Sequence, residues 1–177
     1  GGFVVTLYLQ QVAGYPATAA GLAQLPPTLA MLALSTRFGT LAGRYGARPF
    51  MTAGPLLAAV GFLLLLTTDE GAFYWTQVLP GMVVFGLGLS VTVAPLTTAV
   101  LGAAPPADAG IASAVNNAVA RVAGLVVVAL AGVIVGGALG VGTFHRALLV
   151  TATLFAVGGL LSLVGIRGRP AGPAPTA

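Results

Sequence analysis

The residues best placed for chemistry stand in one apolar stretch, I-A-S-A-V-N-N-A-V-A-R-V-A-G-L-V-V-V-A-L, which begins at Ile111. Ser113, Asn117 and Arg121 recur at four-residue spacing, so on a helix they share one side, and Gly124 follows three residues later. Arg121 lies about ten residues into that helix, roughly 15 Å deep at about 1.5 Å per residue. An arginine at the bilayer centre costs about 2.5–3.5 kcal/mol. It therefore either faces protein or a water-filled cavity, where carbonyls, amides or a carboxylate accept its hydrogen bonds, or it snorkels toward the cytoplasm.

The other titratable groups do not suggest a catalytic centre. The chain has three acids, one histidine and no cysteine, which excludes disulfides, thiolate catalysis and Cys-ligated zinc. An enzyme acting on a lipid-linked substrate would need acids, histidines or metal ligands that converge at one membrane surface. The candidates are Asp69, Glu70, His145 and Arg146, and isolated loop charges are usually only solvated. We expect no enzyme and no metal site, while such an enzyme and a non-transporting sensor or assembly subunit stay open as alternatives.

Composition identifies the environment of these residues. Of 177 residues, 58% are apolar and 6% are charged, whereas soluble domains carry about 25% charged residues. All seven basic residues are arginines, and they are spread through apolar runs, so they form no patch that could bind nucleic acid. The sequence predicts an integral membrane protein of the lipid bilayer. It begins Gly-Gly-Phe, without Met or a charged leader, so we expect a piece of a longer protein.

Five stretches have the roughly 20 mostly apolar residues that a membrane-spanning helix requires. They run over Ala19–Phe38, Phe50–Thr68, Trp75–Leu101, Ile111–Val135 and Phe144–Ile166. A shorter one, Phe3–Val12, predicts the end of a further helix. Residues 1–168 should form one all-α transmembrane domain, and the Pro/Ala/Gly-rich segment 169–177 a disordered cytoplasmic tail. Pro26-Pro27 should kink or break the first span, and Pro80 and Pro95 should interrupt the third.

The arginines orient the spans. With sides alternating along the chain, five of them share one side with Asp108, namely Arg37, Arg44, Arg48, Arg167 and Arg169. The positive-inside rule makes that side cytoplasmic, together with the C-terminus. Phe73-Tyr74-Trp75 then lies at the outer interface, where aromatic rings concentrate. Six alternating spans are compatible with two inverted groups of three, a plan common in secondary transporters.

The spans differ in the faces that they can pack. The second and fifth carry no strong polar group between their ends, which predicts lipid-facing helices. The third places Gly81, Phe85, Gly88, Thr92 and Ala99 near one face, where small residues let another backbone approach. This stripe favours simple helix packing over a substrate-lining role.

The connection 39–49, G-T-L-A-G-R-Y-G-A-R-P, should be a loop between the first two spans. Its glycines permit a tight turn with close backbone approach, and they are Gly39, Gly43 and Gly46. Arg44 and Arg48 could bond helix C-terminal carbonyls or a carboxylate. Composition alone does not separate this role from that of a short inside loop obeying the positive-inside rule.

This connection resembles the loop signature of the major facilitator superfamily, G-x-L-a-[DG]-R-x-G-x-[RK]. The matching residues are Gly39, Leu41, Gly43, Arg44, Gly46 and Arg48. The flank that begins L-Y-L-Q-Q-V-A-G-Y-P and the segment G-I-A-S-A-V-N-N-A-V-A-R-V-A-G are similar to the fourteen-helix drug:proton antiporter branch. Asn117, Arg121 and Gly124 fall on the branch's recurring Asn, Arg and Gly. Gly43 stands where many copies of the loop have Asp, so this chain lacks that carboxylate.

The resemblance implies the C-terminal six-helix half of a plasma-membrane transporter. Its fold class would be all-α, with five complete spans plus the end of a sixth. Such a transporter exports drugs or other amphipathic small molecules by alternating access, with the proton gradient as energy source and no cofactor. In the family pattern, the cut helix and the third span line the cavity, the first and fourth face the missing N-terminal half, and the second and fifth are peripheral.

The resemblance also suggests roles for single residues. We expect the substrate pathway in this half to include Tyr8, Gln11 and Thr92. Residues of the half-to-half interface or of gating should be Gln24, Asn117, Arg121 and Gly124. A proton-coupled carrier needs a titrating group in its pathway, and no acid lies within a span here. The proton carrier should therefore lie in the N-terminal half.

Overall fold

The structure is a computed structural model that describes residues 2–68, 73–103, 105–135 and 140–165. All regular elements within these ranges are helical. In chain order they are α1 (Gly2–Gln11), α2 (Ala17–Leu22), α3 (Leu25–Tyr45), α4 (Ala47–Leu64), η1 (Leu65–Thr67), the π turn η2 (Tyr74–Val78), α5 (Leu79–Ala103), η3 (Pro106–Asp108), α6 (Ala109–Val135) and α7 (Val141–Gly165). The predictions for Asp69, Glu70, Arg167, Arg169 and the tail 169–177 lie outside the described residues.

Within the described residues, five helical segments are long and apolar enough to cross a membrane. They cover Ala17–Tyr45, Ala47–Thr67, Tyr74–Thr97, Ala109–Val126 and Val141–Gly165. The five predicted spans are thereby confirmed, with ends that shift by several residues. The short predicted helix at the start is also present as α1. The chain is an all-helical, multi-pass membrane protein.

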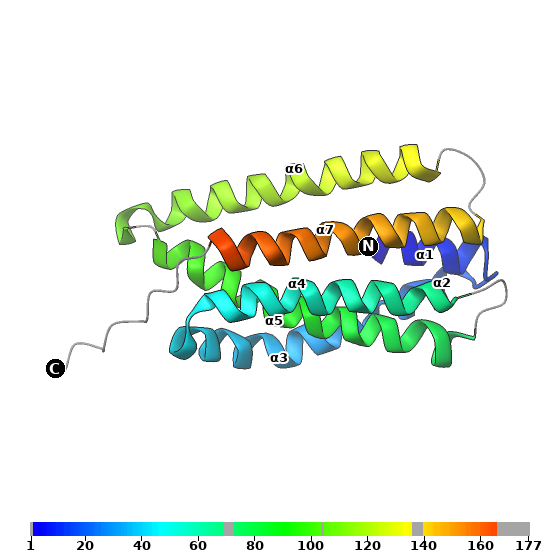
Figure 1. Ribbon diagram of the computed structural model, residues 1–177, viewed down its shortest axis with the longest axis horizontal. Coiled ribbons are helices and arrows are strands. Elements are labelled where there is room, and N and C mark those ends of the chain that lie inside the picture. The colour runs from blue at the N-terminus through cyan, green and yellow to red at the C-terminus, as the bar shows by residue number, and fades with distance from the viewer. Residues whose placement is uncertain (1, 69–72, 104, 136–139, 166–177) are drawn as a thin grey trace.

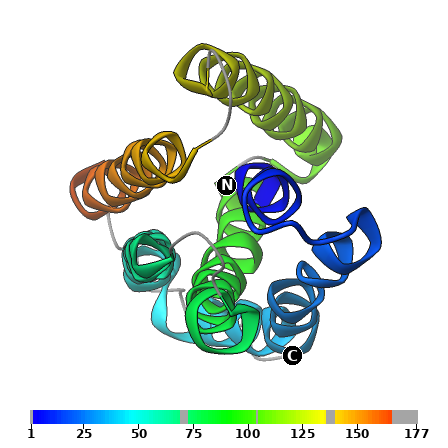
Figure 2. The same cartoon turned by 90° about the vertical axis from the view of Figure 1, so that its right-hand side faces the viewer.

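The long helices lie along the longest axis of the molecule as one bundle, and each runs antiparallel to the next long helix in the chain (Figure 1). We call its two ends the Gly46 end, where α3 turns into α4, and the Trp75 end, where the π turn η2 leads into α5. Viewed end-on, α4 and α7 lie on one side, α3 and α6 on the other, and α1 and α5 between them (Figure 2). Helix α5 packs against both α3 and α4, and α4 also packs against α7. Helix α6 runs along the edge of the bundle.

Helices α4 and α5 approach each other to backbone contact. A Cβ added to Gly61 on α4 would lie 2.6 Å from the Phe85 backbone nitrogen and 2.8 Å from the Gly81 carbonyl oxygen of α5. A Cβ on Gly88 would collide with the backbone nitrogen of Ala58. The small-residue stripe of the third span is therefore confirmed as a packing surface, and its partner is α4. The second span, predicted to face lipid, therefore packs one side of α4 against α5, while Val60, Leu63 and Leu64 of α4 are exposed.

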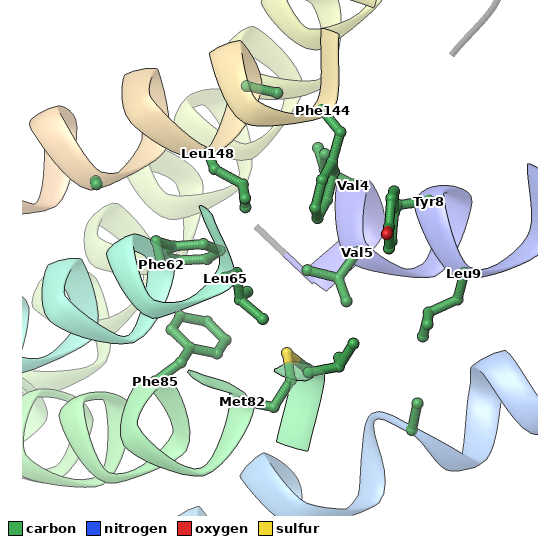
Figure 3. Close-up of a cluster of buried hydrophobic side chains, with 14 of the residues drawn as sticks. Val4, Val5, Tyr8, Leu9, Phe62, Leu65, Met82, Phe85, Phe144 and Leu148 are labelled. Carbon is green, nitrogen blue, oxygen red and sulfur yellow. The ribbon is translucent and has the colours of Figure 1, made fainter. Parts of the chain in front are cut away.

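The largest buried side chains gather toward the Trp75 end (Figure 3). They come from α1, α4, η1, α5 and α7, and include Val5, Tyr8, Leu9, Phe62, Leu65, Met82, Phe85, Phe144 and Leu148. The ring centroids of Phe62 and Phe85 are 4.7 Å apart, which ties α4 to α5 a second time. The short helix α1 is thus fixed by core packing rather than by its own length.

The predicted loop 39–49 is wrong in extent. Helix α3 continues to Tyr45, a single residue, Gly46, makes the turn, and α4 begins at Ala47. Gly46 has φ 85° and ψ 155°, a conformation that a residue with a Cβ rarely adopts. Gly39 and Gly43 are helical, because glycine only lowers helix propensity, by about 1 kcal/mol relative to alanine, and does not forbid a helix.

The prolines behave in two ways. The first span is broken, as predicted, and the break falls at Ala23 and Gln24, just before Pro26 and Pro27 in the first turn of α3. The third span is not interrupted at Pro95, contrary to expectation, because α5 runs through it. Pro80 lies in the first turn of α5, directly after the π turn η2, so the span changes its helical form beside this proline. A transmembrane helix tolerates a proline where neighbouring helices pack against it, and Pro95 is fully buried.

Candidate functional site

The two predicted pathway residues of α1 lie in different environments. Tyr8 is fully buried, and its ring stacks on Phe144 of α7 at a centroid distance of 4.0 Å and an interplanar angle of 14°. Gln11, at the end of α1, is exposed. Tyr8 therefore joins α1 to α7, whereas the Gln11 amide is accessible. Their contact with a substrate stays a prediction.

Thr92, the third predicted pathway residue, lies at the contact between α4 and α5. Its hydroxyl donates to the Gly88 carbonyl one turn earlier at 2.8 Å, and a Cβ on Gly54 of α4 would collide with its Oγ1. The structure thus does not bring Thr92 together with Tyr8 and Gln11 in one site. Packing against α4 accounts for the residue's small size, and its role in a substrate pathway stays a prediction.

Gln24 holds the broken first span against α1. Its Nε2 donates to the Gly2 carbonyl at 3.2 Å and to Thr6 Oγ1 at 3.0 Å, while the Thr6 hydroxyl donates to the same carbonyl at 3.1 Å. This amide therefore bonds within the chain. A further role at an interface with another half stays a prediction.

The backbone at the break is also hydrogen-bonded to the π turn η2, which leads into α5. Pro26 and Pro27 have no N–H, so the carbonyls of Leu22 and Ala23 lose their usual donors four residues on. The Tyr74 hydroxyl of η2 donates to the Ala23 carbonyl at 3.1 Å. The π turn thereby satisfies a carbonyl that the proline pair leaves without a helical partner.

A cavity of about 400 Å³ opens beside this break at the Trp75 end. Its walls come from the end of α1, from α2 and the first turns of α3, and from η2, and they include Leu9, Tyr15, Leu22, Leu29, Tyr74 and Trp75. None of its lining residues within the described ranges is charged. Sequence reasoning placed Phe73-Tyr74-Trp75 at a membrane interface but did not find this cavity. The aromatic cluster and the proline pair are signals for it, but only the fold brings them together.

Three of the predicted interface residues lie on helix α6, which buries little surface against the rest of the bundle. In the window Ala109–Val126 no residue is buried, and Asn117, Arg121 and Gly124 are all exposed. The exposed side chains include large apolar ones, such as Ile111, Val119 and Leu125. An exposed arginine midway along a membrane-spanning helix requires polar partners from outside this bundle or from water.

Two residues of the loop motif act at the Gly46 end. Gly46 makes the turn, and Arg48 in the first turn of α4 donates from Nε and Nη2 to the Leu163 carbonyl at 3.1 and 2.8 Å. Leu163 lies in the last turn of α7, so the predicted bond from this arginine to a helix C-terminal carbonyl is confirmed. A Cβ added to Gly39 would lie 3.4 Å from the Ala94 Cβ of α5, an ordinary contact, whereas Leu41, Gly43 and Arg44 are exposed.

The Trp75 end holds a polar contact that the sequence did not suggest. His145 Nε2 at the start of α7 lies 3.0 Å from the carbonyl oxygen of Thr68, which is fully buried. A carbonyl oxygen only accepts hydrogen bonds, so Nε2 is the donor. The contact ties α7 to the end of the second span. Arg146, its neighbour in the alternative enzyme hypothesis, is exposed.

Comparison with known sequences identifies the family. The Major Facilitator Superfamily profile matches residues 1–177, the whole chain. The chain belongs to the Major Facilitator Superfamily. Its five long helices and the short α1 account for half of such a transporter fold. The break in the first span and the glycine contact between α4 and α5 therefore both lie within one half of the transporter fold.

Several proteins named for resistance are similar to this chain. Multidrug resistance protein Stp of Mycobacterium tuberculosis is 34% identical over 115 residues, which cover 65% of this chain and 21% of that protein. Methylenomycin A resistance protein of Bacillus subtilis is 31% identical over 135 residues, covering 76% and 29%. Puromycin resistance protein pur8 of Streptomyces alboniger is 32% identical over 137 residues, covering 76% and 27%. The chain spans less than a third of the length of these relatives.

Proposed function

We propose that this chain is the C-terminal half of a secondary active transporter that exports drugs or other amphipathic small molecules. The observation that carries the proposal is the match of the whole chain to the Major Facilitator Superfamily, together with relatives named for multidrug, methylenomycin and puromycin resistance. The rival hypothesis, a membrane enzyme, is less well supported. Its candidate His145 bonds the backbone carbonyl of Thr68.

In this proposal a second, N-terminal half covers the side of the bundle formed by α3 and α6. Both helices are little buried within the chain, and both expose leucines or valines that lack partners here. Arg121 would bond carbonyls, amides or a carboxylate of that half. The two halves would rock about a central site, and the exposed Gln11 at the end of α1 would face it.

The proposed energy source is the proton gradient, without a bound cofactor. In the sequence all three acids fall outside the predicted spans, and the structure has Asp108 in the short turn η3 between α5 and α6. We therefore assign the proton-carrying carboxylate to the N-terminal half. We further propose that the protein lies in the plasma membrane with the Gly46 end cytoplasmic, because Arg37, Arg44 and Arg48 lie toward that end.

Transport into inverted vesicles tests this function. The complete protein that contains this chain is expressed, and uptake of ethidium and of puromycin is followed after an imposed pH gradient. We expect uptake of at least one compound that stops with a protonophore. Uptake should also stop when the membrane carboxylates of the N-terminal half are neutralised. Gradient-independent or absent uptake of both compounds, from vesicles that contain the folded protein, would contradict the proposal.

A further inference from the structure

Arg48 lies where two spans end at the same side of the bundle (Figure 1). The α4 span begins at Ala47, directly before this arginine, and the α7 span ends at Gly165, two residues after the Leu163 that Arg48 bonds. The Arg48 side chain is exposed. The ends of membrane spans lie at the level of the lipid headgroups, so this guanidinium is placed where phosphate groups are.

The chain itself holds the Arg48 side chain in place. Its Nε and Nη2 donate to the Leu163 carbonyl at 3.1 and 2.8 Å, and the Thr52 hydroxyl donates to the Arg48 carbonyl at 3.0 Å. One turn deeper, a Cβ on Gly159 of α7 would lie 3.1 Å from the Thr52 carbonyl oxygen, so α4 and α7 touch beneath the arginine. The guanidinium is therefore fixed before a ligand arrives, which lowers the entropic cost of binding.

The bonds to Leu163 leave both charge and donors for a ligand. The Leu163 carbonyl is neutral, so it does not cancel the positive charge of Arg48, and a guanidinium carries more N–H donors than the two that these bonds use. Among the described residues the single acid is Asp108, on η3 between α5 and α6, whereas Arg44 is a second exposed cation at the Gly46 end. The remaining donors suit a phosphate, whose oxygens match the guanidinium fork.

The surface beside Arg48 is apolar and suits the acyl part of a lipid. Leu160, Leu163 and Val164 in the last turns of α7 are exposed, and α7 carries no charged residue after Arg146. A free phosphate ion would use the arginine alone, whereas a phospholipid would also cover these apolar side chains. A fixed cation at headgroup level above an apolar helix face therefore favours an anionic amphiphile.

We propose that Arg48 and the last turns of α7 bind an anionic phospholipid of the surrounding membrane. The lipid phosphate accepts hydrogen bonds from the Arg48 guanidinium, and an acyl chain lies along Leu160 and Val164. This site lies on α4 and α7, away from the side of the bundle formed by α3 and α6. Lipid binding goes beyond the proposed function, and it depends neither on transport nor on which side of the membrane the Gly46 end faces.

Quenching by brominated lipids tests the site. The complete protein, otherwise without cysteine, carries a fluorophore on Val164→Cys and is placed in phosphatidylcholine vesicles. Brominated phosphatidylglycerol and brominated phosphatidylcholine are added in separate samples at the same mole fraction. We expect phosphatidylglycerol to quench as though it were enriched about fivefold, which corresponds to about 1 kcal/mol, the contribution of one arginine near an anionic lipid surface. A fluorophore on Leu149→Cys, nearer the other end of α7, should show no such preference.

Variants of Arg48 locate the binding. Arg48→Gln keeps an amide donor for the Leu163 carbonyl but removes the charge, so the preference for phosphatidylglycerol at position 164 should disappear. Arg48→Lys keeps the charge without the fork that fixes it, so the preference should fall to about twofold. Arg146→Gln removes an exposed arginine from the other end of α7 and should leave the preference unchanged. If Arg48→Gln does not fold, Arg48→Lys decides.

The outcomes separate a lipid site from general electrostatic attraction and from a free ion. Equal quenching by the two lipids at position 164, or a preference that survives in both Arg48 variants, overturns the proposal. An equal preference at positions 149 and 164 reflects attraction to the whole positively charged protein, and it also overturns the proposal. Inorganic phosphate in excess, compared with sodium chloride of equal ionic strength, forms the second arm. We expect the same preference in both salts, and its loss in phosphate alone would show that a free ion occupies the site.

Discussion

Gly61 and Gly88 determine how closely α4 and α5 approach. Each faces the backbone of the other helix, so that an added methyl group would meet main-chain atoms of Phe85 or Ala58, which cannot rotate away. In a membrane, where lipid is as apolar as the side chains, close backbone packing of this kind drives helix association. These two residues therefore have a structural reason to be glycine, although neither lines the cavity at the Trp75 end.

We expect Gly61→Ala and Gly88→Ala each to destabilise the protein by about 1–3 kcal/mol, because the added methyl group forces the two helices apart. The measurement is the midpoint of thermal unfolding in detergent. Gly158→Ala on α7 is the matched control, since a Cβ there meets nothing within 4 Å. Equal midpoints for Gly88→Ala and Gly158→Ala would contradict the close contact.

At the scale of elements, the loop motif contains the end of α3, the turn at Gly46 and the start of α4. Gly46 makes the turn with positive φ, and Arg48 then caps the C-terminus of α7 through the Leu163 carbonyl. A cation near a helix C-terminus interacts favourably with the helix dipole. The motif thus connects three helices, α3, α4 and α7, at the Gly46 end.

We expect Arg48→Ala to lower stability by about 0.5–1 kcal/mol, since it removes two hydrogen bonds from an exposed charged donor to the end of α7. Arg48→Lys should recover part of the loss, because an ammonium keeps the charge but not the fork. Hydrogen exchange of the last turn of α7 is the readout, and Arg37→Ala serves as the control. Unchanged exchange in Arg48→Ala would remove the capping role.

The positions of the spans were predictable, because each membrane-spanning helix requires about 20 apolar residues and the stretches between them are rich in glycine, proline or charged residues. Two predictions about breaks failed. Glycines at 39 and 43 and the proline at 95 weaken a helix only locally, and the helix continues through each of them. Packing helps at Gly39 and Pro95, whereas Gly43 is exposed and is helical without it. The role of Arg48 followed from its chemistry. The cavity did not, because it depends on three segments meeting, which local sequence does not encode.

At the scale of the molecule, the bundle has a packed side and an open side. Helix α5 is the most buried of the five long helices, whereas α6 buries nothing between Ala109 and Val126 and still presents Asn117 and Arg121. Isolated charged side chains in a membrane are expensive, so this surface requires a partner. The proposed N-terminal half supplies it, and the family membership supports that arrangement.

We expect Arg121→Ala in the complete protein to slow transport and to lower stability by about 1 kcal/mol, because hydrogen bonds between the halves are lost. Initial rates of uptake into inverted vesicles and unfolding midpoints are the measurements. Arg146→Ala, an exposed arginine at the Trp75 end, is the control. Unchanged transport together with unchanged stability in Arg121→Ala would show that this arginine is not at an interface.

The central claim is that α6 faces a second half of the transporter and not lipid. The chain has no cysteine, so single labels can be placed freely. A fluorophore is attached to Asn117→Cys on α6 or to Leu154→Cys on the exposed side of α7 in the complete protein, otherwise without cysteine, in vesicles of brominated phospholipid. We predict strong quenching at position 154 and little at position 117. Equal, strong quenching at both positions would contradict the account.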